Sequence, residues 1–233
     1  MNYLEYALRL ANLIPVNNSS TQFQNMLPAT IDYAEQRIYR ELDLLSTVVT
    51  NSTSSTTAGN RNFTLPTGSG KYVTVQTINV ITPAATAPDS GTRRQLTPVD
   101  RRYLDAVWNS STGSTVPKHF AMNDQDTIIF GPWPDAAYRV EVVGTIRPTP
   151  LSATNTTTFL TLYLPDLFMA ASLVFAGENM RDFGAEGGNA AVSQTWEQNY
   201  QGLMASANAE ELRKRFAGPG WSSMSQVANP PNR

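Results

Sequence analysis

The chain of 233 residues contains no cysteine. This absence excludes a disulfide framework, thiol catalysis and a metal held by cysteine. Charged residues are also scarce, at 15% of the chain, and the formal net charge is −2 with a pI of about 5.4. This balance argues against a surface dedicated to nucleic acid, although it leaves room for a local basic patch. Hydrophobic residues make up 41% of the chain, which is enough for a sizeable core.

Histidine and long apolar runs are scarce as well. His119 is the single histidine, so a catalytic triad or a histidine-based metal site would have to use it alone. We assign it a structural role in a predicted strand. No apolar run approaches the roughly 20 residues that a membrane span needs. The first residues carry Glu5 and Arg9 and lack the apolar centre of a signal peptide.

Two motifs suggest chemistry, and both have a simpler explanation. Residues 68–71 resemble the end of a phosphate-binding loop, but Leu65 stands where a glycine is required and Tyr72 replaces the final serine or threonine. Asp124 and Asp126 lie in a predicted hairpin turn, which explains them without a cation. No motif places a pair of carboxylates. The sequence therefore predicts no enzyme, no cofactor and no metal site.

The most regular pattern is an amphipathic helix from Leu27 to Leu45. Its apolar residues recur at steps of three and four, and charged residues lie between them. Pro28 suits the first turn of such a helix, where its missing N–H is not needed. Similar patterns predict helices at residues 2–13, from about residue 160, and at residues 189–216.

The period changes from helical to alternating between these helices. Residues 47–62 are rich in Ser, Thr, Asn and Gly and predict an exposed loop. A short helix is expected at residues 98–108, with Pro98 in its first turn. Alternation predicts strands at residues 72–81, 118–122, 127–130 and 138–146.

These patterns together predict an α+β fold. A helical bundle of residues 1–46 and 160–217 is interrupted by a β-rich, sandwich-like insertion of residues 47–159. Residues 218–233 have no hydrophobic period and form a predicted extended C-terminal arm.

Cations near helix ends and apolar residues of the arm are the candidate contact residues. The basic run that ends the last helix is explained by the helix dipole, and the alternative is contact with an acidic partner or with DNA. Two arginines of the helix at residues 27–45 and two apolar anchors of the arm complete the set. The candidate interface residues are Arg37, Arg40, Arg213, Lys214, Arg215, Trp221 and Met224.

Three stretches carry a resemblance to a known family. They are residues 27–45 with the core Ala34–Leu42, residues 117–135 ending in Ile-Ile-Phe-Gly-Pro-Trp-Pro-Asp, and residues 151–167 with Leu-Pro-Asp near the end. Their order and spacing resemble phage head-to-tail adaptor proteins, similar to tail tubular protein A of short-tailed phages. The resemblance spans nearly the whole chain.

The resemblance implies a structural role in the virion. Subunits of that family form a ring, usually twelvefold, between the portal protein and the tail nozzle, and genomic DNA passes through the lumen without sequence readout. For this chain it implies a homo-oligomeric, dodecameric ring that is assembled in the host cytoplasm and contacts no membrane. The β-rich insertion would bind the nozzle or tail tube, and the arm would reach the portal or a neighbouring subunit.

Two alternatives remain open. The first is another neck or tail-completion protein, which differs in its partner. The second is a carbohydrate-binding or receptor-binding module that presents the aromatic faces of Tyr72, Trp108, Trp133 and Tyr138. The long helices would have no explanation in that second case.

Overall fold

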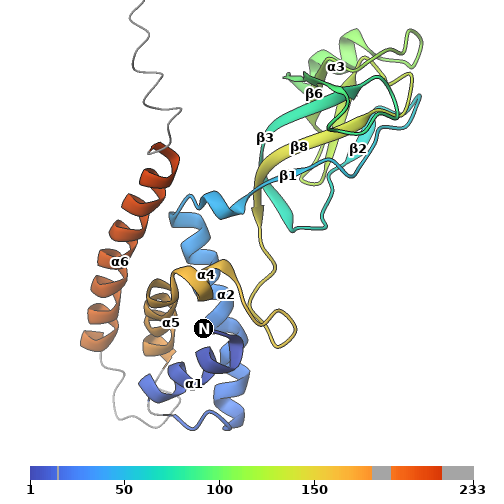
Figure 1. Cartoon of the computed structure of the whole chain (residues 1–233). Coiled ribbons are helices and arrows are strands. Elements are labelled where there is room, and N and C mark those ends of the chain that lie inside the picture. Colours follow the sequence, from blue (N-terminus) through green and yellow to red (C-terminus); the bar gives the residue numbers. More distant parts are fainter. Residues whose placement is uncertain (15, 180–189, 217–233) are drawn as a thin grey trace, which may run out of the picture. The chain divides into compact units, whose positions relative to one another are not determined.

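The computed structural model describes residues 1–14, 16–179 and 190–216 (Figure 1). The chain divides into a first unit of residues 1–46 and 149–233 and a second unit of residues 47–148. Six helices and two four-stranded sheets lie within the described residues, which confirms the predicted α+β class. Residues 149–159, which the sequence analysis grouped with the insertion, fall in the first unit.

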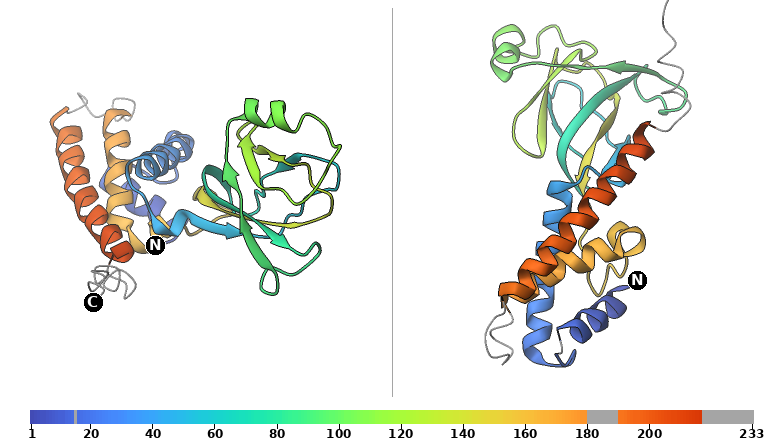
Figure 2. Two further views of the ribbon diagram at one scale, coloured as in Figure 1. Left: turned by 90° about the horizontal axis from the view of Figure 1, so that it is seen from above. Right: turned by 90° about the vertical axis from the view of Figure 1, so that its left-hand side faces the viewer.

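The first unit is helical, and α5 lies at its centre. This helix packs against both α2 and α6, which lie on either side of it in Figure 2. Its residues are apolar nearly all round, as expected for a helix enclosed by others. The buried residues of α5 include Leu167, Phe168, Ala170, Ala171, Leu173 and Val174. The helices are α1 (Tyr3–Leu13), α2 (Thr21–Glu41), α4 (Phe159–Tyr163), α5 (Pro165–Asn179) and α6 (Ala190–Phe216), with a 3-10 turn at Leu45–Thr47.

Helix α1 begins at a capping box. The Asn2 side chain accepts the N–H of Glu5, and the Glu5 carboxylate accepts the N–H of Asn2. Further along, the buried Tyr6 hydroxyl donates to Ser172 Oγ of α5 at 2.7 Å, and that hydroxyl donates to the carbonyl of Phe168. Burial raises the pKa of the Tyr6 hydroxyl well above its ordinary value. This polar chain fixes α1 against α5.

Helix α2 differs from the predicted helix at both ends. It starts at Thr21, because the Ser20 hydroxyl caps it by accepting the N–H of Phe23. The predicted first-turn position of Pro28 is therefore wrong, since this proline lies inside the helix on its exposed side. The helix also ends earlier than predicted, because Leu42 adopts an extended backbone.

The second unit consists of two β-sheets in which most neighbouring strands are antiparallel. Among the described residues the strand orders are β1-β8-β3-β4 and β2-β7-β6-β5, and only the short β5–β6 pair is parallel. Apolar residues of both sheets meet in one core that includes Phe63, Ile78, Phe130 and Val140. The strands are β1 (Val48–Asn51), β2 (Asn62–Thr64), β3 (Lys71–Thr82), β4 (Thr92–Gln95), β5 (Thr97–Pro98), β6 (His119–Met122), β7 (Thr127–Gly131) and β8 (Arg139–Arg147).

Two predictions within this unit are wrong. Residues 47–62 are not a loop throughout, because β1 pairs with β8, whose residues are nearly a hundred positions later in the chain. The short helix α3 (Arg101–Val107) does not have Pro98 in its first turn. Asp100 caps α3, and Pro98 belongs to β5.

Helix α3 covers the outer face of the second sheet. Leu104 packs there with Ala121 and Ile129. A side chain at Gly131 would collide with the ring of Trp108, so glycine allows this aromatic residue to approach the strand closely.

Candidate interaction surfaces

Arg37 joins α2 to α6 inside the first unit. Its two terminal nitrogens donate to the carboxylate of Glu197 at 2.8 and 2.6 Å, and its Nε lies 3.1 Å from Glu41. The guanidinium also lies 4.1 Å from the ring centre of Tyr200. Only 14% of the side chain is exposed, and its hydrogen bonds lower the pKa of Glu197. The guanidinium of the predicted contact residue Arg37 is thus bonded to groups of its own chain.

Arg40 and Arg213 are placed differently, because both are exposed. Arg40 Nε donates to the carbonyl of Gln36 at 3.0 Å, and Arg213 Nε donates to the carbonyl of Ala209 at 3.2 Å. Neither forms an ion pair with any residue that the structure describes. Their positive charges remain available to a partner.

Lys214 and Arg215 are held by nearby acidic residues. Lys214 Nζ lies 2.8 Å from Glu210 and 2.7 Å from Glu211 on the same helix. Arg215 donates to the backbone carbonyl of Asp43 at 2.7 Å and lies 3.9 Å from its carboxylate. The Arg215 bonds attach the end of α6 to the segment that follows α2. The remaining candidates, Trp221 and Met224, lie outside the described residues.

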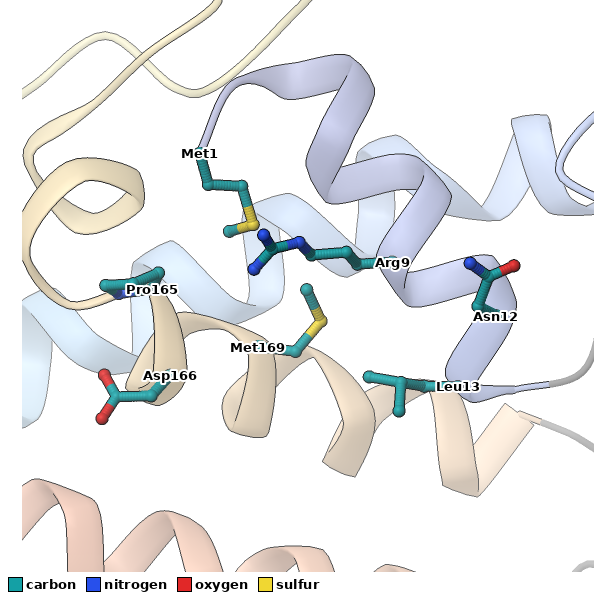
Figure 3. A pocket seen from close by; sticks show the side chains of 7 residues that line it. All are labelled: Met1, Arg9, Asn12, Leu13, Pro165, Asp166 and Met169. Atoms are coloured by element: carbon teal, nitrogen blue, oxygen red, sulfur yellow. The ribbon is translucent and has the colours of Figure 1, made fainter.

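A groove of about 500 Å³ lies between α1 and the start of α5 (Figure 3). Its walls are mainly apolar, and Arg9 projects between Met1 and Met169 in the close view. Asp166 lines the same groove, yet no ion pair joins it to Arg9. The lining residues are Met1, Arg9, Asn12, Leu13, Pro165, Asp166 and Met169.

Glu35 is a buried carboxylate on α2, where the charged residues were expected to lie between the apolar positions. Its Oε1 accepts the N–H of Leu151 at 3.0 Å, and burial raises its pKa to about 7. The signal was present in the spacing, because Glu35 is four residues after Ile31 and three before Ile38, both on the apolar stripe. The burial of Glu35 was not predicted, because a charged residue on an amphipathic helix is ordinarily assigned to the exposed side.

The residues of the motifs set aside in the sequence contact neighbouring side chains or backbone groups. The Asp124 carboxylate accepts the N–H of Asp126, which lowers its pKa and stabilises the hairpin turn. Lys71 opens β3 and lies 3.6 Å from Asp126. His119 stacks on Trp108 with ring centres 5.2 Å apart. In the described part of the chain no group of three potential metal ligands occurs.

Two of the four aromatic residues considered for sugar binding are not accessible to a ligand. Tyr72 and Tyr138 are buried in the core between the sheets, so neither presents a face to a ligand. Trp133 and Trp108 are half-buried, and the Trp133 indole N–H donates to the carbonyl of Trp108 at 3.0 Å. The predicted aromatic platform is therefore wrong for both tyrosines.

Two of the described surfaces are accessible to a protein partner. They are the exposed cations Arg40 and Arg213 and the mainly apolar groove between α1 and α5. No helix in the described ranges is both long and apolar enough to cross a bilayer.

The comparison with family models gives the family. The chain belongs to the SU10 adaptor protein family, whose model matches residues 1–223. It is accordingly a phage adaptor protein with a structural role at the head-to-tail junction. A search of curated proteins found no match. The narrower resemblance to tail tubular protein A stays a prediction.

Proposed function

We propose that copies of this chain form a ring between the portal protein and the tail nozzle, and that DNA passes through its lumen. The observation that supports this most directly is the match of the adaptor family over residues 1–223. The ring is dodecameric in this proposal, stands in the virion neck and is assembled in the host cytoplasm. The chain itself performs no catalysis.

The helical unit supplies the contacts around the ring. A repeated head-to-tail contact between unlike surfaces closes into a ring when the rotation per subunit allows it. The exposed Arg40 and Arg213 extend these contacts to neighbouring or portal carboxylates. Arg37, Lys214 and Arg215 act indirectly, because their bonds to acidic residues of the same chain fix the helices that carry the surface.

The β-rich unit binds the nozzle, and the lumen lets DNA slide. A formal net charge of −2 supports a wall that does not hold phosphates tightly. Trp221 and Met224 anchor the C-terminal arm on the portal or on a neighbouring subunit.

Electron microscopy of the purified protein mixed with its portal tests this proposal. The expected result is a ring stacked coaxially on the portal, with a subunit count that the images give directly. A complex with tail components alone, and none with the portal, would favour another neck or tail-completion protein instead.

Truncation after Gly218 tests the arm. The shortened chain should keep the helical circular dichroism of the full chain, because the described core ends before this point. Its binding to the portal, measured by co-sedimentation, should weaken by about tenfold or more if two apolar anchors are lost. Unchanged assembly and portal binding would exclude a role for Trp221 and Met224.

A further inference from the structure

Helix α1 carries an exposed apolar ridge. Leu4 is 75% exposed and Leu8 is 49% exposed, and the two lie one helical turn apart on the same side. Isolated exposed leucines are ordinary, but two adjacent ones form a continuous apolar strip. We call Leu4 and Leu8 the leucine ridge.

The groove between α1 and α5 borders this ridge, because its lining residue Asn12 lies one turn after Leu8 on the same helix. Leu13, at its edge, is half exposed, and by the 3.6-residue turn it lies about 140° around α1 from Leu8. Met1 and Met169 form adaptable walls, because methionine side chains adjust to the shape of an incoming group (Figure 3). The ridge and the groove are therefore unlike surfaces on one element.

The charges beside these two surfaces are complementary. Glu5 is exposed and follows Leu4 directly, and one of its oxygens accepts the N–H of Asn2. Arg9 is exposed in the groove, one turn after Glu5 on the same helix. No ion pair involving either of them is found among the described residues. An approaching ridge with an acidic flank thus meets an unpaired cation in the groove.

We propose that the leucine ridge of one copy docks into the α1–α5 groove of the next copy. This inference rests on the proposed ring and names the contact that builds it. The occupant is a second copy, because one chain carries both halves of the contact. One half is the leucine ridge with Glu5 beside it, and the other half is the apolar groove with Arg9. A contact between unlike surfaces is heterologous, and each copy then has one ridge and one groove left to continue the ring.

Charge substitutions on each half test the contact in the full chain. Leu4→Glu and Leu13→Glu change exposed side chains, so the fold should be retained, as checked by circular dichroism. Each should raise the concentration at which half of the chains are assembled by about tenfold or more, measured by sedimentation velocity. Val107→Glu on α3 is the matched control, since Val107 is 51% exposed and lies in the β-rich unit, outside the contact. Equal assembly of the wild type and both α1 variants overturns the proposal.

Cross-linking tests the arrangement of the copies. Because the chain has no native cysteine, only the introduced thiols react. A chain with both Leu4→Cys and Leu13→Cys, treated with a short bis-maleimide, should give a ladder of covalent multimers. Either substitution alone should give monomers. Covalent dimers from Leu4→Cys alone would mean that the ridge meets itself, which contradicts a heterologous contact.

The two proposals fail in different ways. A wild-type chain that forms no ring, alone or on its portal, contradicts the proposed function and this contact together. Rings on the portal that persist in Leu4→Glu and Leu13→Glu contradict the contact and leave the adaptor ring intact.

Discussion

Glu35 is a titrating group in the interior of the helical unit. Burial raises its pKa from an ordinary 4.5 to about 7, and the nearby charge of Asp32 acts in the same direction, while the N–H of Leu151 opposes both. The folded state therefore holds the proton more tightly than the unfolded state. The resulting stability is fully present below pH 4.5 and is lost as the pH rises towards 7.

Glu35→Gln should remove this pH dependence. Glutamine keeps a carbonyl that accepts the N–H of Leu151 and carries no charge at any pH. Between pH 4.5 and 7 the free energy of unfolding of the wild type should fall by about 2–3 kcal/mol relative to the variant. Urea unfolding of both chains across this range measures the difference. Parallel curves would show that the carboxylate is ionised in the fold without penalty.

Arg37 and Arg40 make a matched pair of cations on one helix. Arg37→Ala removes the two-pronged bond to Glu197 and the contact with the Tyr200 ring, and should destabilise the chain by about 1–2 kcal/mol. Arg40→Ala should change stability by less than about 0.5 kcal/mol, because its side chain bonds only to its own helix. Thermal unfolding of both variants measures the two losses of stability. Equal losses would mean that the bond to Glu197 contributes little.

At the scale of elements, α2 contains a proline that its own geometry does not favour. Pro28 lies seven residues into the helix, lacks an N–H for the carbonyl of Gln24, and is exposed. Pro28→Ala should therefore stabilise the chain by about 1–3 kcal/mol without leaving a cavity. Asn25→Ala, at another exposed position of α2, is the control and should gain less than about 1 kcal/mol. A destabilised Pro28→Ala chain, measured by urea unfolding, would show that the proline serves a contact on the surface of α2.

The elements that were predictable from sequence are those with local signals. Helix α1 was predicted at nearly its observed limits, because Asn2 caps it and its apolar stripe is continuous. Strands β6 to β8 were predicted closely, since a turn at residues 123–126 separates the first two. Strand β1 was missed because its pairing partner β8 is distant in sequence, and polar residues gave no alternation to detect.

The surfaces were less predictable than the elements. Arg37 was selected for its charge, yet packing turns it towards Glu197 on a helix 160 positions later. The leucine ridge escaped notice because Leu4 and Leu8 belong to the same apolar pattern as the core residues of α1. Only the placement of α5 decides which leucines are covered and which are exposed.

At the scale of the whole molecule, the β-rich unit is inserted into the helical unit through two adjacent strands. Val48, at the start of β1, pairs with Thr145, close to the end of β8. Antiparallel partners lie about 5 Å apart, so the chain enters and leaves the β-rich unit at neighbouring positions. Each unit also has its own apolar core. We expect an insertion with adjacent ends and a separate core to fold as a unit of its own.

Separation of the two units should therefore leave both folded. Residues 47–148 alone should unfold in a single cooperative transition, and a chain in which four Gly and Ser residues replace this unit should keep the helical circular dichroism of residues 1–46 and 149–233. If the adaptor ring forms through α1 and α5, the helical chain should also still assemble, and it should lose only the partner that the β-rich unit binds. Sedimentation velocity and pull-down with tail components measure the two properties separately. Loss of assembly together with the β-rich unit would place the contact between copies on the strands, because the ridge and groove would still be present and would have proved insufficient.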